Sequence, residues 1–297
     1  MGTRWSARVV GAPPGLADGI QSVLDGVVAQ MSHWQPASNL SRFNRAAPGA
    51  WQQLPPEFSR VLAAGLKIAK ASNGAFDPVM GALADLWGFG PPGPRTGVPD
   101  TAEVAQALAQ SGRASIEHDA PLLRARRTAP VALDFSGIAK GYAVDAVAQY
   151  LQTRGLQDYL IEVGGELLGA GIKPDGQPWW VDLETVPGVA LPPIRVALHG
   201  LAIATSGDYR RHFTADGRRY AHTLDPRTGV PLDNGVASVT VLHPECMLAD
   251  AWATALTVLG PEALAVATRE QLAMHMVVRE GTGFREILSP ALVEMLG

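Results

Sequence analysis

Residues 248–256 read LADAWATAL, a run of Ala and Leu that carries two oxygen-bearing side chains. Ala and Leu are strong helix formers, so the run predicts a short amphipathic helix. Asp250 and Thr254 are four residues apart, which places them one turn apart on the same helix face. A carboxylate beside a hydroxyl suits a hard cation such as Mg²⁺. The pair also has a purely structural interpretation, because an early Asp complements the helix dipole and a helical Thr bonds the preceding turn.

The composition around this run is that of an ordinary globular protein. The chain has 297 residues, 47% of them hydrophobic and 18% charged, with a net charge of −4. That charge gives no indication of binding to nucleic acid or to an anionic membrane, so we expect no nucleic-acid partner. The single cysteine, Cys246, excludes an intramolecular disulfide and a thiolate metal cage. We expect it to be a small buried hydrophobe.

The sequence also bears on membrane spans and on localisation. No run reaches the ~20 apolar residues of a membrane span, so we expect no transmembrane segment. The first residues, MGTRWSARVV, lack the basic-then-apolar pattern of a signal peptide. As written, the chain is expected to be cytoplasmic, or cell-envelope (periplasmic) if a leader has been removed.

Strands and helices are predicted on both sides of the 248–256 helix. Residues 236–242, VASVTVL, are β-branched and apolar and predict a strand just before it. After it we expect a helix over 261–270, strands over 273–279 and 284–288, and a last helix over 289–295. Closer to the N-terminus, apolar spacing predicts a strand over 3–10 and helices over 15–31, 55–73 and 101–110. Paired strands are predicted over 114–118 and 122–126, and further strands over 159–163, 167–172, 179–184, 194–198 and 201–205.

This order of elements predicts the α+β class, with mixed or antiparallel sheets and helices packed on one side. We expect a single domain over 1–297, which leaves room for two intimate α+β halves. Strand–helix–strand order recurs in each half, which is compatible with a diverged duplication.

The segment Ser136–Gly141, SGIAKG, is the first of several polar, glycine-rich joints. We expect a strand to run into Ser136-Gly137 and a helix to continue to Arg154. Backbone N–H groups at a helix start favour an anion, and Lys140 adds positive charge. The spacing does not match the nucleotide P-loop, so an ordinary strand-to-helix joint is an equally good interpretation.

Other candidates are more ambiguous one by one. Trp34, in a polar loop, is either a core plug or a stacking surface for a ligand ring. Five arginines lie within residues 210–227, and guanidinium groups suit phosphate oxygens, although each alone is also typical of a solvated turn. His222, in YAHTLDP, is as compatible with a ligand contact as with a structural role.

Taken in order, these segments resemble the ApbE family of flavin transferases, the FAD:protein FMN transferases. The resemblance runs from Met1 to Gly260 and implies an ApbE-like, T-fold-like architecture. The segments that carry it are MGTRWS, SHWQPASNLSRFN, GAFDPVMGALADLWGFG, LDFSGIAKGYAVD, EVGGELLGAG, ATSGDYRRHF, YAHTLDPRTGVP and the Asp250–Thr254 stretch.

The resemblance implies both a metal site and an FAD site. In the family, Mg²⁺ is held by a backbone carbonyl and by the Asp and Thr of a helix, here Ala139, Asp250 and Thr254. Trp34 stands where the family often has Tyr. The implied FAD contacts are Met1, Trp34, Ala75, Phe76, Asp77, Ser136, Lys140 and His222.

The implied reaction is Mg²⁺-dependent transfer of FMN from FAD to a Ser or Thr hydroxyl of an acceptor protein, with release of AMP. His222 or Asp77 would take the hydroxyl proton, and the sequence does not decide between them. Acceptors in the family are often subunits of membrane redox complexes. Two alternatives remain from the residues: a Mg²⁺-dependent FAD pyrophosphatase giving FMN and AMP, and a non-catalytic FAD-binding protein.

Overall fold

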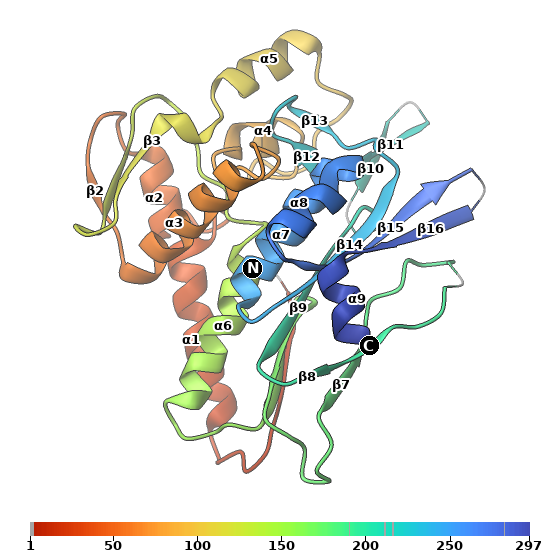
Figure 1. Cartoon of the computed structure of the whole chain (residues 1–297). Coiled ribbons are helices and arrows are strands. Elements are labelled where there is room, and N and C mark those ends of the chain that lie inside the picture. Colours follow the sequence, from red (N-terminus) through yellow and green to blue (C-terminus); the bar gives the residue numbers. More distant parts are fainter. Residues whose placement is uncertain (1–2, 190, 211, 216, 282) are drawn as a thin grey trace. The chain divides into compact units, whose positions relative to one another are not determined.

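The structure is a computed structural model that describes residues 3–189, 191–210, 212–215, 217–281 and 283–297. Its helices and antiparallel sheets confirm the predicted α+β class. The chain divides into two compact units (Figure 1). The first unit contains Val27–Gly137 and Arg210–Asp233, and the second contains Gly2–Gly26, Ile138–Tyr209 and Asn234–Gly297.

The first unit is built from short helices and small sheets. Its helices are the end of α1 (Leu16–Met31), α2 (Asn39–Arg45), α3 (Pro56–Ala71), α4 (Gly81–Leu86), α5 (Thr101–Ala109) and the 3₁₀ turn η1 (Arg113–Ser115). One sheet has the order β2-β4-β3, and two hairpins pair β10 with β11 and β12 with β13. Their bounds are β2 Gln52–Gln53, β3 Ile116–Asp119, β4 Arg124–Arg127, β10 His212–Ala215, β11 Arg218–Ala221, β12 Leu224–Asp225 and β13 Val230–Pro231.

The predicted strand leading into Ser136 is wrong. Val131, Leu133 and Phe135 are buried in alternation, as in a strand, but no strand in the described part of the chain pairs with this segment. Instead the Asn44 side chain accepts a hydrogen bond from the Leu133 N–H at 2.8 Å and donates one to its carbonyl at 2.8 Å. A side-chain amide thus does for Leu133 what a neighbouring strand does elsewhere.

The second unit is organised around one antiparallel sheet of seven strands in the order β1-β5-β6-β9-β14-β15-β16. Helices α6 and α7 pack against each other and against this sheet (Figure 1). The strands are β1 (Trp5–Val9), β5 (Tyr159–Val163), β6 (Glu166–Ala170), β9 (Leu201–Gly207), β14 (Val236–His243), β15 (Ala273–Glu280) and β16 (Gly283–Leu288). The remaining elements are α6 (Ala139–Gln152), β7 (Trp179–Asp182), β8 (Arg195–Leu198), α7 (Cys246–Leu259), η2 (Gly260–Glu262), α8 (Ala263–Arg269) and α9 (Pro290–Leu296).

Both faces of this sheet are covered, because successive side chains of a strand point to opposite faces. Ile203 of β9 is opposite Leu242 of β14, and both belong to a core cluster with Leu292 of α9 and Trp179 of β7. Ser206, on the other face of β9, contacts Thr254 of α7. The long helices therefore lie on one face, while the β7–β8 hairpin and short α9 cover the other.

Helices α6 and α7 approach unusually closely at Gly141. A Cβ added to Gly141 would lie 2.3 Å from the carbonyl oxygen of Cys246 and 2.8 Å from Cβ of Asp250. The carbonyl group is backbone and the Cβ position is fixed by the backbone, so neither can rotate away. The glycine of the SGIAKG segment is therefore needed for helix-to-helix contact within the second unit.

The helix that carries Asp250 is longer than the sequence suggested. It begins at Cys246, so Asp250 lies beyond the first turn, and it ends at Leu259. Together with η2 and α8 it gives Cys246–Arg269, a stretch long and apolar enough to cross a membrane by length and composition. Because 67% of the apolar window is buried inside the protein, this stretch is typical of a core helix.

Candidate functional site

Each of the two packed helices is capped by a carboxylate of the other. Neither α6 nor α7 has a side-chain cap of its own or an acidic residue in its first turn. Asp145 of α6 accepts hydrogen bonds from the N–H groups of Cys246 at 2.8 Å and Met247 at 2.9 Å, at the start of α7. Asp250 of α7 accepts one from the Gly141 N–H at 3.0 Å, at the start of α6. The two carboxylates satisfy amides that a helix start leaves unpaired.

Lys140, Glu166 and Asp250, here called the Lys140 cluster, bring opposite charges together beside these helix starts. The Lys140 ammonium donates a short hydrogen bond to Oε1 of Glu166 and lies 3.8 Å from Oδ1 of Asp250. The Glu166 side chain is completely buried, that of Asp250 is 5% exposed and that of Lys140 is 27% exposed. Glu166 is opposite Val163 in the β5–β6 pair, on the sheet face that carries α6.

The predicted metal ligands fall within the same part of the second unit. Asp250 has one oxygen, Oδ2, bonded to Gly141, and Oδ1 faces Lys140. Thr254 lies one turn further along α7, as the spacing predicted, and its hydroxyl is 3.3 Å from the hydroxyl of Ser206. Ala139 is the first residue of α6 and is 7% exposed. No group of three or more His, Cys, Asp or Glu suited to a metal occurs among the described residues.

Several charged side chains around the starts of α6 and α7 act on the buried thiol of Cys246. Burial raises the pKa of the Cys246 thiol, and the negative charges of Asp145, Glu166 and Asp250 raise it further, while Lys140 acts in the opposite direction. The four charged side chains that act on this thiol carry a formal charge of −2. The prediction that Cys246 is buried is confirmed.

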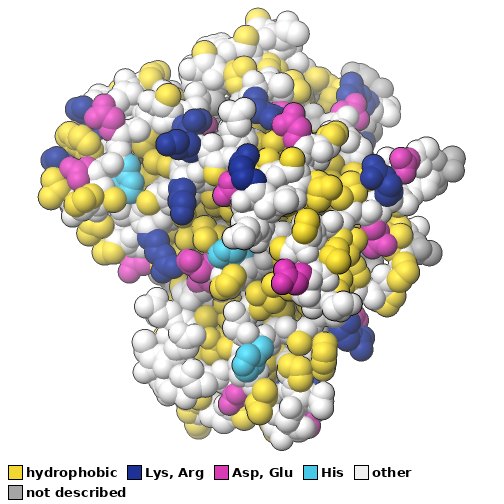
Figure 2. All heavy atoms as spheres, viewed as in Figure 1, with side chains coloured by type: hydrophobic (Ala, Val, Ile, Leu, Met, Phe, Trp, Pro, Cys, Tyr) yellow, Lys and Arg dark blue, Asp and Glu magenta, His cyan; other side chains and the backbone are white. Residues whose placement is uncertain are grey.

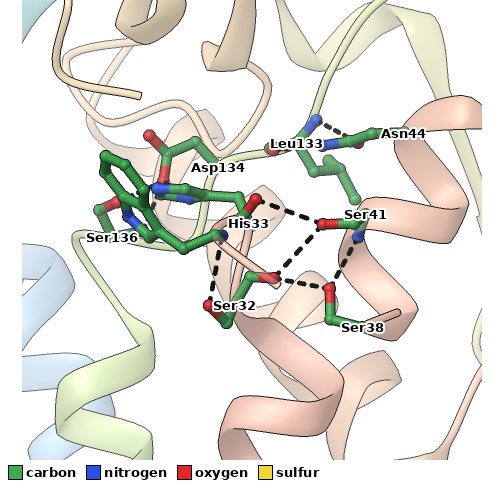
Figure 3. Close-up of polar contacts among 9 residues, drawn as sticks. Ser32, His33, Ser38, Ser41, Asn44, Leu133, Asp134 and Ser136 are labelled. Atoms are coloured by element: carbon green, nitrogen blue, oxygen red, sulfur yellow. Dashed lines mark hydrogen bonds and ion pairs between the residues drawn. The ribbon is translucent and has the colours of Figure 1, made fainter. Parts of the chain in front are cut away.

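In the first unit, three serines fix the loop that carries His33 and Trp34 (Figure 3). Ser38 caps α2 by accepting from the Ser41 N–H at 3.0 Å. The Ser38 hydroxyl donates to the Ser32 carbonyl at 2.6 Å, and the Ser41 hydroxyl is 3.3 Å from the His33 carbonyl. Trp34 is 48% exposed, and its ring centroid lies 5.4 Å from that of His33.

His33, Asp134 and Ser136 form a polar network next to this loop (Figure 3). Nδ1 of His33 lies 3.3 Å from Oδ1 of Asp134, which also accepts hydrogen bonds from the hydroxyl of Ser136 at 2.6 Å and from its N–H at 2.7 Å. Burial raises the pKa of Asp134, but its contacts with His33 and Ser136 outweigh burial and hold the pKa below its usual value. Burial, with repulsion from Asp134, raises the pKa of Asp85 to about 6.

The ApbE family model matches residues 1–277 of the chain. The chain belongs to the ApbE family. Among curated relatives it is similar to the FAD:protein FMN transferase of Vibrio cholerae, at 37% identity over 100% of this chain and 90% of the relative. It is also similar to the FAD:protein FMN transferase of Klebsiella pneumoniae, at 36% identity over 98% of this chain and 85% of the relative.

Solved ApbE structures have the same fold. The apo form of the Pseudomonas stutzeri flavinyl transferase ApbE matches with a TM-score of 0.88 and 38% identity, covering 99% of this chain and 98% of that one. The flavin transferase ApbE from Vibrio cholerae matches with a TM-score of 0.91 and 35% identity, covering 99% and 96%.

The predicted FAD contacts of this ApbE chain differ in how accessible they are. Met1 lies outside the described residues. Ala75 and Phe76 are buried, at 0% and 5% exposure. Asp77 is 7% exposed, and its two oxygens accept hydrogen bonds from the N–H groups of Val79 at 2.8 Å and Arg113 at 3.0 Å. Burial raises the pKa of Asp77 despite these hydrogen bonds.

His222 lies in an aromatic part of the first unit. The ring of Phe89 meets it edge to face, with 6.3 Å between the ring centroids, and Phe213 packs near Phe89 at 5.8 Å. Two of the predicted phosphate-binding arginines already have carboxylate partners. Arg227 pairs with Asp225 at 2.8 Å, and Arg218 pairs with Asp233 at 2.7 Å. Arg211 lies outside the described residues.

The sequence interpretation missed several polar residues that the structure places at these sites. Glu166 follows the Gly164-Gly165 turn and is a lone carboxylate at the start of an apolar strand, which is itself a signal of a buried ion pair. Asp145 is four residues after Gly141 and so shares its helix face. His33 and Asp134 carried no such signal, because their pairing depends on how two separate loops fold.

Proposed function

We propose that this protein is an FAD:protein FMN transferase that acts through one Mg²⁺ ion. Membership of the ApbE family and the names of its relatives support the enzyme class and FAD as the substrate. The observation that carries the metal is the pair of oxygen side chains on α7: Asp250, whose Oδ1 lies beside Lys140 at the start of α6, and Thr254, one turn further along. As part of the same proposal, the whole chain 1–297 acts as one transferase domain.

The donor set in the second unit fits Mg²⁺. Oδ1 of Asp250, the hydroxyl of Thr254 and the carbonyl of Ala139 would hold it, because all three are hard oxygen donors. This set includes only one carboxylate, and Mg²⁺ in proteins usually keeps several water or phosphate ligands. When bound, the ion would neutralise charge on the FAD pyrophosphate and orient it.

The flavin contacts remain predictions, and the exposure and chemistry of each residue support them to different degrees. Trp34 is an exposed aromatic residue, which is suited to stacking on a flavin or adenine ring. Ser136 and Lys140 offer a hydroxyl and an ammonium to polar groups of FAD. Ala75, Phe76 and Asp77 are buried, so they offer FAD little accessible surface and are the least supported of these contacts. Met1 stays a prediction outside the described residues.

The reaction joins a Ser or Thr oxygen of the acceptor to the phosphorus of the FMN half of FAD. The bond from that phosphorus to the bridging oxygen breaks, and AMP leaves. The acceptor hydroxyl must lose its proton as it attacks. Of the two predicted bases, we favour His222, because both oxygens of Asp77 already accept backbone hydrogen bonds. The exchange of a phosphoanhydride bond for a phosphoester bond needs positioning and charge neutralisation more than covalent catalysis.

The decisive test compares two aspartates that make the same kind of contact. Asp250→Asn keeps an oxygen for the Gly141 N–H but removes the charge, and we expect FMN transfer to fall at least about 10²-fold. Asp145→Asn, the matched control, alters the equivalent helix cap and should retain most of the transfer activity. The assay mixes protein, FAD, Mg²⁺ and a candidate acceptor protein, and follows the FMN mass increment.

Three other results would contradict the proposal. Equal loss in the two variants would mean that Asp250 acts only as a helix cap. Rapid release of both FMN and AMP without an acceptor would indicate a pyrophosphatase. Binding of FAD that is indifferent to metal and never turns over would indicate a non-catalytic FAD-binding protein. An acceptor whose target Ser or Thr is replaced by Ala provides the blank.

A further inference from the structure

We propose that Glu166 is a positioning residue that holds the Lys140 ammonium away from Asp250 and so keeps Oδ1 of Asp250 available to the metal. This inference rests on the proposed function. It assigns a role to a residue that carries none of the predicted contacts.

The geometry of the Lys140 cluster is asymmetric in the way this role requires. The ammonium is within hydrogen-bonding distance of Glu166 but stands 3.8 Å from Oδ1 of Asp250. At 3.8 Å the two charges still attract, yet no hydrogen bond forms. An ammonium bonded directly to that oxygen would stand about 2.8 Å from it, and a bound Mg²⁺ would stand about 2.1 Å from it. Both could not share the oxygen without strong repulsion between the cations.

Burial explains why Lys140 stays with Glu166. Glu166 is completely buried on strand β6, whose antiparallel pairing with β5 fixes its place. A buried carboxylate that lost its counter-ion would be strongly destabilised, so Glu166 retains the ammonium. Asp250 depends on Lys140 less, because its other oxygen already accepts from the Gly141 N–H at the start of α6.

Removing the Glu166 charge should therefore release Lys140 toward Asp250. The lysine stem is flexible, and the nearest remaining carboxylate of the cluster is that of Asp250. The ammonium would then compete with the divalent cation for the same oxygen. We therefore predict that Glu166 affects metal binding only when Lys140 is present. A simple effect of one more negative charge would not depend on Lys140.

The test is a double-mutant cycle on metal binding, with Glu166→Gln, Lys140→Met and the two combined. Mn²⁺ replaces Mg²⁺ as the probe, and electron paramagnetic resonance counts free Mn²⁺ in the full chain with FAD, against a blank of FAD alone. We expect E166Q to weaken Mn²⁺ binding about 10- to 100-fold when Lys140 is present. In the Lys140→Met background the same change should cost less than about threefold.

The combined variant also shows whether a loss of Mn²⁺ binding in Glu166→Gln is caused by misfolding. It replaces a buried ion pair by neutral side chains of similar size, an exchange that proteins often tolerate, and it leaves the charge of the region at −2. Restored Mn²⁺ binding in this variant supports the positioning role. An equal loss from Glu166→Gln in both backgrounds overturns it, because Glu166 would then act by charge alone. If the unmodified chain and Asp250→Asn bind Mn²⁺ equally, the proposed metal site itself is wrong, which is a separate failure.

Discussion

The segments on either side of Ser136-Gly137 are held in place by different means. Residues 131–135, in the first unit, are extended and buried without belonging to a strand. The Asn44 side chain satisfies the N–H and carbonyl of Leu133, while the Asp134 N–H donates to the Pro78 carbonyl and the Ala132 carbonyl accepts from the Gly81 N–H. Residues of α6, in the second unit, satisfy one another within the helix, and a distant carboxylate completes its start. The difference shows that a polar joint can have regular helical hydrogen bonds on one side and, on the other, a mixture of side-chain and loop backbone hydrogen bonds.

The largest effect on stability is expected from the helical side of this comparison. Gly141→Ala places a methyl group 2.3 Å from the Cys246 carbonyl oxygen, so α6 and α7 must separate. We expect a loss of about 3 kcal/mol in the free energy of unfolding, measured by urea denaturation. Gly26→Ala, in α1, is the control, because an added Cβ there meets nothing within 4 Å. That change should stabilise the protein by about 0.5–1 kcal/mol.

A smaller loss is expected from the extended side. Asn44→Ala leaves the N–H and carbonyl of the buried Leu133 without their partner. We expect a cost of about 2 kcal/mol, by the same urea measurement. Gln53→Ala removes an exposed amide hydrogen bond to the Leu122 carbonyl and should cost less than about 0.5 kcal/mol. Equal effects in the two variants would mean that Asn44 does not replace a neighbouring strand.

The smallest effect concerns charge near the extended segment. The pKa of Asp85 is raised to about 6, so the folded state binds a proton more readily than the unfolded chain. The cost of ionising Asp85 therefore appears as the pH rises from about 4 through 6 and is complete above it. Asp85→Asn should raise the free energy of unfolding at pH 8 but not at pH 4. We expect a gain of less than about 1 kcal/mol, because the residue keeps contact with solvent, which screens the charge of its partly buried carboxyl group. An equal gain at both pH values would contradict a charge effect.

The helical side was open to prediction from the sequence and the extended side was not. Helix α7 could be predicted because Asp250 and Thr254 sit in a run of helix formers, and their one-turn spacing follows from local geometry. The alternation of Val131, Leu133 and Phe135 predicted a strand. It indicates only that one side of the segment is buried. Whether a strand or a side chain such as that of Asn44 pairs with such a segment depends on residues far away in the chain.

The candidate site shows the same limit. Asp250 and Thr254 were identified by spacing, and the family resemblance supplied the identity of the metal and substrate. Glu166 was missed although its segment had been recognised, because its partner Lys140 is brought to it by sheet register and helix packing. Contacts of this kind are tertiary, and no local pattern encodes them.

The exchange of caps between α6 and α7 has a consequence for the order in which the protein folds. Gly141 and Asp250 are 109 residues apart in sequence, and Asp145 and Cys246 are 101 apart. Neither helix start can be completed until the intervening chain has closed a loop of that length, which is a slow, non-local event. The oxygen proposed to bind the metal is thus fixed in place only late in folding. Amide hydrogens of Gly141 and Cys246 should accordingly exchange with solvent through global unfolding rather than through local fraying.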